Sequence, residues 1–147
     1  MASKTPINQS VVIKSTRSGI AEVCRRLLFE LETNDFSRED IFAIHLALEE
    51  AFLNAVRHGN KMDPGKEIKI DYSVSSDKVE ISMADEGDGF DPIAVPDPRC
   101  GENLYKTKGR GLLLMRSYMD VIEFNERGNR VHMVRYKEKP HLINTQG

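Results

Sequence analysis

Hydrophobic residues along this chain recur in two patterns, one typical of helices and the other of strands. Between Ile20 and Leu31 apolar side chains return every three or four residues, which predicts an amphipathic helix that Thr16 or Ser18 could cap. A second helical pattern follows Ser37, which suits an N-cap because acidic residues occupy the first turn after it. This second helix is predicted to run to about His58.

Alternating apolar and polar residues predict several strands. The β-branched segment 10–14 is typical of a first strand. Segments 68–74 and 79–83 both alternate and are separated by a polar turn, so they predict an antiparallel hairpin. Segments 121–124 and 131–136 predict a second hairpin that closes the chain.

The remaining segments set the predicted domain organisation. One domain is expected over residues 10–137, between an N-terminal tail at 1–9 and a C-terminal tail at 138–147. Residues 90–108 contain several prolines and show no sustained period, and an internal loop of this length is usually a functional lid or a disordered segment. An apolar helix is predicted from about 111 to 119.

Composition and charge describe an ordinary soluble domain. The 147 residues are 39% hydrophobic and 30% charged, which is enough for one core beneath a charged surface. A formal net charge of −2 argues against direct binding to nucleic acid or to an acidic membrane. No apolar run approaches the roughly 20 residues of a membrane span, and the N-terminal segment lacks a signal-peptide core, so a cytoplasmic protein is expected. Cys24 and Cys100 predict neither a disulfide framework nor a metal site, and Cys24 is expected to be a small buried hydrophobe.

The first candidate site group lies in the second predicted helix. Glu50 and Asn54 are four residues apart, so their side chains lie on one helix face. A carboxylate there can polarise a hydroxyl or water, and the amide oxygen of Asn54 is a suitable ligand for Mg²⁺. Both could equally be solvated helix residues, although the small side chains of Ala51 and Ala55 leave room for a ligand. His58 is interpreted as a helix-end residue because no second histidine or cysteine stands at ligand spacing.

The second group is Asp85-Glu-Gly-Asp-Gly89, directly after a predicted strand. A strand-end aspartate can accept a hydrogen bond from an adenine amino group, and Gly87 and Gly89 permit close approach of the backbone to a ligand. An acidic β-turn is the alternative. A calcium loop fits poorly, because no bidentate acid follows at the required spacing and Pro92 intervenes.

The third group is Gly109-Arg-Gly111, immediately before the predicted helix. Free backbone N–H groups and the helix dipole make such a helix start suitable for phosphate. Lys108 adds positive charge, and Arg110 could donate two hydrogen bonds to phosphate oxygens. Neither a Walker lysine motif nor a dinucleotide fingerprint occurs, so a nucleotide site here would belong to neither of those classes.

These three groups, in this order, resemble the GHKL superfamily, whose ATP-binding fold is shared by gyrase, sensor histidine kinases and the mismatch-repair MutL proteins. Within it, the bacterial anti-sigma factor serine-protein kinases match best. The segment from Leu48 to Asn60 resembles their N box, and segments 85–89 and 109–115 resemble their two glycine boxes. The resemblance extends over about residues 10–136.

The resemblance implies a role for each matching residue. Glu50 would be the general base that accepts the proton of a serine hydroxyl, Asn54 would hold Mg²⁺, and Asp85 would bind adenine. Nucleotide contacts are expected from Asn54, His58, Asp85, Gly87, Gly89, Lys108, Gly109, Arg110, Gly111 and Leu112. The implied fold is a two-layer α/β sandwich of the α+β type, with helices on one face of a mixed, mainly antiparallel sheet.

The function implied by the resemblance is that of an ATP-binding anti-sigma factor and serine/threonine-protein kinase. Its expected partners are a sigma factor and a STAS-domain antagonist that is phosphorylated on serine, and a homodimer is a further option. The short proline-rich lid, and Arg127-Gly-Asn129 where many relatives carry Gly-Thr, leave lid closure and turnover open. Two alternatives are an ATP-binding regulatory module without phosphate transfer and a structural domain with a vestigial pocket.

Overall fold

The computed structural model describes residues 6–60, 63–87, 115–126 and 128–137. These ranges contain a five-stranded sheet, two long helices and one short π-helical segment, with residues 115–118 also helical. The elements are β1 (Ile7–Lys14), α1 (Arg17–Thr33), α2 (Arg38–Asn54), η1 (Ala55–Gly59), β2 (Glu67–Val74), β3 (Lys78–Asp85), β4 (Val121–Phe124) and β5 (Arg130–Tyr136). None of the helices in these ranges is long and apolar enough to cross a membrane.

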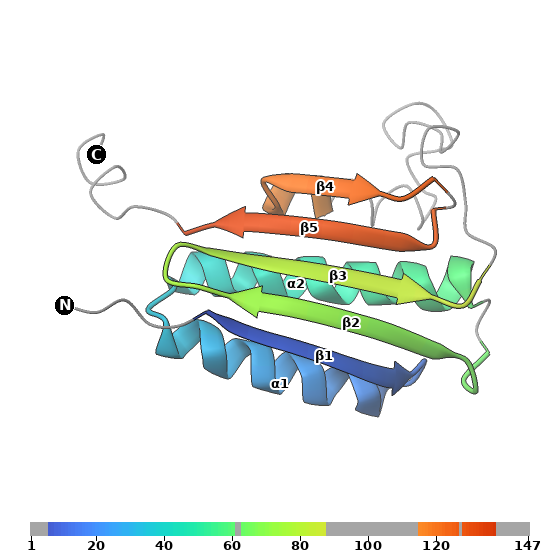
Figure 1. Cartoon of the computed structure of the whole chain (residues 1–147). Coiled ribbons are helices and arrows are strands. Elements are labelled where there is room, and N and C mark those ends of the chain that lie inside the picture. The colour runs from blue at the N-terminus through green and yellow to red at the C-terminus, as the bar shows by residue number, and fades with distance from the viewer. Residues whose placement is uncertain (1–5, 61–62, 88–114, 127, 138–147) are drawn as a thin grey trace.

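The strands lie in the order β1-β2-β3-β5-β4, and every pairing among them is antiparallel (Figure 1). The predicted hairpin of β2 and β3 is confirmed, with Val74 opposite Val79 next to the turn. The closing hairpin of β4 and β5 is confirmed as well. β1 begins three residues before the predicted strand, because Ile7 still pairs with Val74 at the end of β2.

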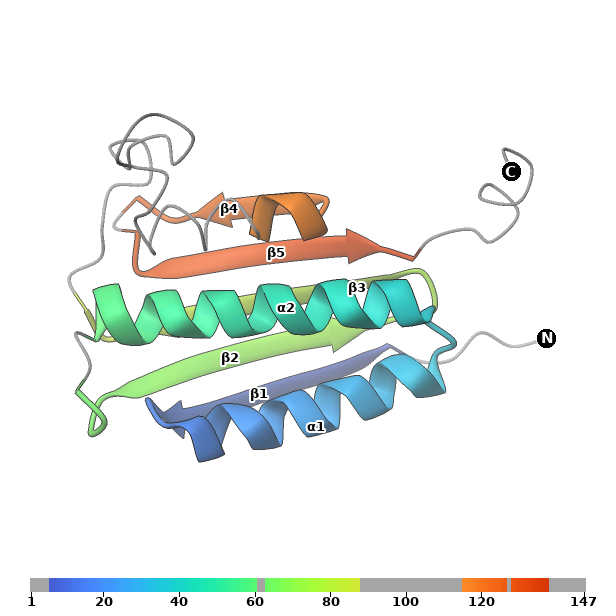
Figure 2. The same cartoon turned by 180° about the vertical axis from the view of Figure 1, so that it is seen from behind.

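Both long helices cover the same face of the sheet, so the molecule has two layers (Figure 2). The core lies between these layers because β2 places alternate side chains toward the helices and the helices place their apolar stripes toward β2 and β3. Its largest buried apolar side chains are Leu27, Leu31, Ile44, Leu48, Ile68, Ile70, Val74, Val79, Ile81, Met115 and Met133. The predicted two-layer α/β sandwich with a mainly antiparallel sheet is therefore confirmed.

Side chains at the helix starts act as predicted caps. Thr16, one of the two expected candidates, caps α1 by accepting a hydrogen bond from the Gly19 N–H at 3.3 Å. Ser37 caps α2 by accepting one from the Asp40 N–H at 3.0 Å. Between the helices, Asp35 adopts the left-handed conformation at φ 62°, which turns the chain from α1 into α2.

A buried ion pair joins the start of α2 to strand β5. Arg135 on β5 donates from Nε to Asp40 Oδ1 at 2.9 Å, and the Asp40 side chain is fully buried. The same guanidinium donates from Nη1 to the Tyr118 carbonyl at 2.6 Å. The two contacts fix α2 and the helical residues 115–118 against β5.

The end of α2 differs from the prediction. The α-helix stops at Asn54 instead of continuing to His58, and residues Ala55–Gly59 form a π-helical turn. The Asn60 N–H donates to the Ala55 carbonyl, five residues back, at 2.7 Å, which is the hydrogen bond that defines a π turn. Short π segments inside helices are frequent at functional sites, and this one follows Asn54 directly.

The side chain of Asn60 joins four segments of the chain. It is fully buried, and its Nδ2 donates to Ser15 Oγ at 2.9 Å and to the Glu67 carbonyl at 3.1 Å. Its Oδ1 accepts from the Glu86 N–H at 2.9 Å. One amide therefore fixes the end of η1 against the β1–α1 junction, the start of β2 and the segment that leaves β3.

We predict that Asn60→Ala lowers the free energy of unfolding by about 2–4 kcal/mol, because Glu67 and Glu86 keep their positions but lose a buried partner. Urea unfolding measures this loss. Asn125→Ala is the matched control. The Asn125 side chain likewise bonds to two backbone groups, the N–H groups of Asn129 and Arg130, but it is exposed. Water can replace that partner, so the control should cost no more than about 1 kcal/mol. Equal losses in the two variants would contradict the role assigned to Asn60.

Candidate functional site

A small cavity lies where α2 ends, between this helix, β3 and the β4–β5 hairpin. Its volume is about 20 Å³, which is room for about one water molecule. The residues that line it are Ala51, Asn54, Ala55, Met83, Asp85, Met115, Phe124, Gly128, Asn129, Arg130 and Val131. A ligand as large as a nucleotide would therefore need side chains at this place to move.

The cavity brings together two of the predicted site residues. Asn54 comes from the last turn of α2 and Asp85 from the last position of β3, and both line the cavity although they are 31 positions apart in the sequence. The small residues Ala51 and Ala55 line it too, as expected for a helix that a ligand approaches closely. The structure therefore brings together one helix residue and one strand residue that the sequence had suggested for a single site.

Glu50 lies one helical turn before Asn54 and is partly exposed. An i, i+4 pair is about 40° apart around an α-helix, so the two side chains share a face. Glu50 does not line the cavity, however. Within the described part of the chain its side chain makes no hydrogen bond or ion pair, which leaves the carboxylate available to an incoming group.

Asp85 is held by backbone groups at the end of β3. Its N–H donates to the Asn129 carbonyl at 2.9 Å, and its Oδ1 accepts from the Gly87 N–H at 2.8 Å. Burial raises the pKa of the Asp85 carboxyl, while the Gly87 N–H and the charge of Lys66 oppose that rise. The net result is a raised pKa. Ionising this carboxylate therefore costs free energy, and a hydrogen-bond donor that binds to it would offset that cost.

The segment after β3 is well fixed up to Gly87. Gly87 is buried, and Glu86 is tied to Asn60 through its N–H and to the Glu67 N–H through its carboxylate. The chain bends at Glu86 and Gly87 directly after the strand. Gly89 lies outside the described residues.

The other predicted nucleotide contacts are not all within the described ranges. Lys108, Gly109, Arg110, Gly111 and Leu112 lie outside them, as does the predicted lid. His58 lies within η1, and its side chain is outside the described part of the structure. The helix predicted after Gly111 is described at residues 115–118, where Met115 is fully buried and lines the cavity.

Sequence reasoning did not assign the β4–β5 hairpin to the site. Gly128 and Asn129 line the cavity, and Gly128 adopts φ 73°, a conformation that glycine takes without strain. Asn125 shapes this turn by accepting from the N–H groups of Asn129 and Arg130 at 3.1 and 3.2 Å. The available signal was the turn sequence Arg127-Gly-Asn129, which had been noted only as a departure from the resembling family.

The donor set of the cavity fits a base and a hard cation. A half-buried carboxylate at Asp85 can accept a hydrogen bond from an amino group, and Met83, Met115 and Phe124 offer apolar surface to an aromatic ring. The amide oxygen of Asn54 is a ligand of the kind that Mg²⁺ prefers.

Comparisons with known proteins agree with this arrangement. The family of histidine kinase-like ATPase domains matches residues 13–135. A serine-protein kinase RsbW of Bacillus licheniformis is 32% identical over 120 residues, which cover 76% of this chain and 67% of that protein. The serine-protein kinase RsbW of Bacillus subtilis is 30% identical over 132 residues, covering 85% of this chain and 76% of that protein.

A solved structure shows the same fold. The RsbU and RsbW domains of a Mycobacterium tuberculosis protein match 92% of this chain with a TM-score of 0.57 and 16% sequence identity. This chain spans 34% of that solved chain. The family match covers most of the sequence, and the residues that line the cavity all lie within the matched range. The chain therefore belongs to the histidine kinase-like ATPase domain family and is an ATP-binding domain related to the RsbW serine-protein kinases.

Proposed function

We propose that this protein is an ATP-dependent protein-serine/threonine kinase that also acts as an anti-sigma factor. The observation that carries the proposal is the meeting of Asn54 and Asp85 at one cavity, with Glu50 one helical turn away on the same helix. The relatives named serine-protein kinases, at about 30% identity, support the same activity. The substrate proposed is a serine of a STAS-domain antagonist, and the sequestered partner is a sigma factor.

Adenine recognition is proposed to depend on Asp85. Its carboxylate would accept a hydrogen bond from the exocyclic amino group of the base, and Gly87 would let the backbone approach the ring closely. The cavity as described is too small for adenine, so binding is expected to displace side chains such as Met115 or Phe124. Gly89, Lys108, Gly109, Arg110, Gly111 and Leu112 remain proposed contacts, mainly for phosphate, and His58 for the nucleotide.

Phosphoryl transfer is proposed to depend on α2. Asn54 would hold Mg²⁺, which when bound supplies positive charge that neutralises phosphate oxygens. Glu50 would orient the serine hydroxyl and take its proton as the hydroxyl oxygen attacks the terminal phosphorus of ATP. The bond from that phosphorus to the bridging oxygen breaks, and ADP leaves. Because an i, i+4 pair is rigidly spaced on a helix, α2 would hold the cation and the base in fixed register.

One observation favours a second candidate function, an ATP-binding regulatory module that transfers no phosphate. Glu50 does not line the cavity that contains Asn54 and Asp85. If no substrate serine reaches Glu50, the nucleotide would only control binding to a protein partner. The Glu50 experiment below separates the two functions.

We predict that Asp85→Asn weakens binding of Mg-ATP about tenfold to hundredfold, because a charge-assisted hydrogen bond to the base is lost. Isothermal titration calorimetry measures the dissociation constant. Asp71→Asn is the matched control, since Asp71 is a partly exposed aspartate on the neighbouring strand β2 and does not line the cavity. It should bind as the unaltered protein does. Unchanged affinity in Asp85→Asn would contradict the proposed recognition of adenine.

The raised pKa of Asp85 gives a second prediction for the same variant. A carboxyl whose pKa is higher in the folded than in the unfolded state destabilises the fold once it ionises. The melting temperature of Asp85→Asn should therefore match that of the unaltered protein at low pH. As pH rises from the pKa of an unfolded aspartate through the raised folded value, the melting temperature of Asp85→Asn should increasingly exceed that of the unaltered protein. Scanning calorimetry without nucleotide tests this, and a gain confined to low pH would contradict it.

We predict that Glu50→Gln still binds ATP but transfers phosphate about 10²–10⁴ times more slowly, because the amide cannot accept the serine proton. The assay incubates protein with Mg-ATP labelled at the terminal phosphate and the STAS-domain protein encoded nearest to it. Glu32→Gln, at an exposed glutamate near the end of α1, is the control and should retain full activity.

The outcomes of this assay are distinct. Label on a serine that depends on Glu50 supports the kinase. Label at an undiminished rate in Glu50→Gln contradicts the role of this residue as general base. ATP binding by the unaltered protein without any label favours the regulatory module, and no ATP binding would overturn both functions.

A further inference from the structure

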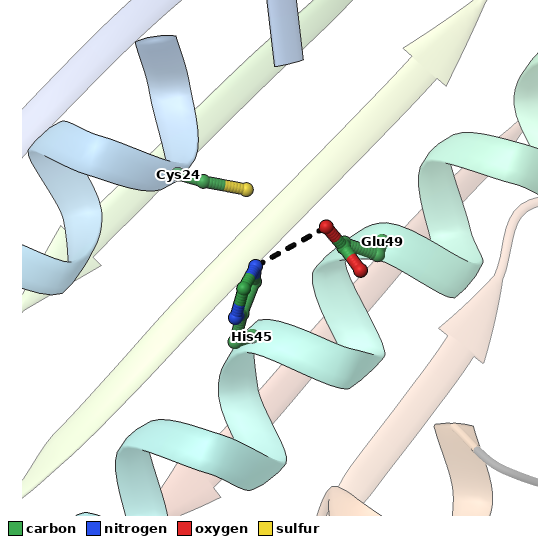
Figure 3. A group of neighbouring side chains, drawn as sticks. All are labelled: Cys24, His45 and Glu49. Carbon is green, nitrogen blue, oxygen red and sulfur yellow. Dashed lines mark ion pairs between the residues drawn. The ribbon is translucent and has the colours of Figure 1, made fainter. Parts of the chain in front are cut away.

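A cysteine, a histidine and a glutamate converge between the two long helices, away from the nucleotide cavity. Cys24 is on α1, whereas His45 and Glu49 are one turn apart on α2 (Figure 3). Their Sγ, imidazole nitrogen and carboxylate oxygen atoms all lie within 4.8 Å of one another. Nε2 of His45 already stands 3.2 Å from Oε2 of Glu49.

We propose that Cys24, His45 and Glu49 form a binding site for Zn²⁺ that clamps α1 to α2. Thiolate, imidazole and carboxylate are the three donor types that zinc takes in proteins, and three protein ligands leave a fourth position for water. A hard cation such as Mg²⁺ would not select this set, because it prefers oxygen ligands alone. The proposal does not depend on the kinase activity.

The distances are close to those of a zinc site. Zinc bonds of about 2.0–2.3 Å at tetrahedral angles place the ligand atoms roughly 3.3–3.6 Å apart. The His45 and Glu49 atoms, 3.2 Å apart, are close to this separation. The thiol sulfur lies within 4.8 Å of both, so it would have to approach by no more than about 1.5 Å. No movement of either helix is required, because each ligand has at least one rotatable bond between its backbone and its donor atom.

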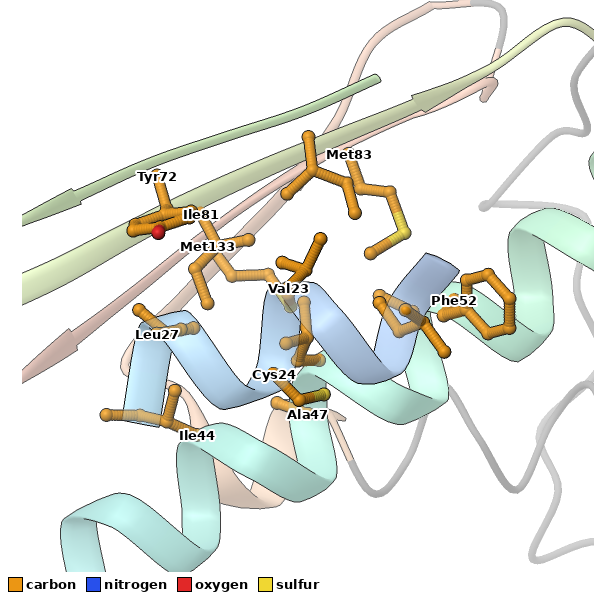
Figure 4. Packing of buried hydrophobic residues seen from close by; sticks show 14 of the residues in the cluster. Val23, Cys24, Leu27, Ile44, Ala47, Phe52, Tyr72, Ile81, Met83 and Met133 are labelled. Atoms are coloured by element: carbon orange, nitrogen blue, oxygen red, sulfur yellow. The ribbon is translucent and has the colours of Figure 1, made fainter. Parts of the chain in front are cut away.

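The surroundings allow a metal to enter and hold it once bound. A groove of about 560 Å³ between the helices is lined by all three ligands, so an ion and its water reach them from solvent. Behind the groove, Cys24 lies against the core close to Ala47 (Figure 4). The thiol is 7% exposed, whereas the His45 and Glu49 side chains are 40% and 50% exposed. The sulfur would thus form the inner end of the site and the other two ligands its outer end.

Electrostatics and proton balance are consistent with a divalent cation. On binding, zinc would displace the thiol proton to solvent, and thiolate plus carboxylate would neutralise the two charges of the ion. Two arginines, Arg17 and Arg25, line the same groove, and Arg25 is held by Glu22 at 2.5 Å.

The test is a zinc titration of the full chain, freed of metal by a chelator and without nucleotide, against a chromophoric zinc indicator. The unaltered protein should bind one zinc per chain, and Cys24→Ser and Glu49→Gln should each bind at least about tenfold more weakly. Mg²⁺ and Ca²⁺ should not compete. With zinc at a hundred times its dissociation constant, the melting temperature should rise by roughly 5–10 °C in the unaltered protein, and by no more than about half of that in Cys24→Ser and Glu49→Gln.

Two matched variants separate this site from adventitious binding. His132→Gln removes a histidine that also stands near a glutamate, with His132 Nε2 3.5 Å from Glu80 Oε1, but without a thiol. Cys100→Ser removes the other cysteine. Both should bind zinc as the unaltered protein does. Co²⁺ should give a thiolate-to-metal absorption band in both, and none in Cys24→Ser.

Circular dichroism establishes that each variant is folded, and Glu49→Gln, at an exposed side chain, decides the question if Cys24→Ser does not fold. The proposal is overturned if the unaltered protein binds no zinc. It is equally overturned if Cys24→Ser and Glu49→Gln bind as tightly as the unaltered protein, or if only Cys100→Ser or His132→Gln loses the metal.

Discussion

The buried amide of Asn60 is the contact on which the geometry of the nucleotide cavity depends. The segment that leaves β3 must hold Asp85 and Gly87 against the end of α2, yet Asn54 and Asp85 are 31 positions apart in the sequence. Asn60 joins the two segments, because its backbone N–H closes the π turn after Asn54 and its side-chain Oδ1 accepts a hydrogen bond from the Glu86 N–H. A buried amide with three satisfied hydrogen bonds has little freedom to move, so the two halves of the cavity keep a fixed separation.

Helix α2 serves the core and the candidate sites with different faces. Its inner face contributes Ala47, Ala51 and other small residues, which let the helix lie close to the sheet and leave space beside Asn54. The ion pair of Asp40 and Arg135 fixes its start, and the π turn fixes its end. A helix anchored at both ends can present side chains with little positional variation, which a site for phosphate chemistry requires.

Local patterns in the sequence predicted most of the fold, because the interactions that decide it are local. The alternating residues Ile68, Ile70 and Tyr72 are buried on β2, and Ser37 caps α2 as its type suggests. The errors occur where distant segments decide. The polar residues at the start of β1 join the strand only through pairing with β2, and the π turn forms through contacts of Asn60 with other segments. The same holds for the site: motif order placed Asn54 and Asp85 together, but Asn129 reaches the cavity only through a hairpin register that no local pattern records.

The convergence of Cys24, His45 and Glu49 escaped sequence spacing for the same reason, since the ligands come from two helices. Successive residues of an α-helix are about 100° apart, so Glu49 and Asn54 diverge by about 140° around α2 while Glu50 and Asn54 diverge by about 40°. The two neighbouring glutamates are therefore about 100° apart around one helix: Glu50 shares the face of the proposed Mg²⁺ ligand, and Glu49 faces α1. The two proposed cation sites would thus lie on different sides of one helix and share no ligand.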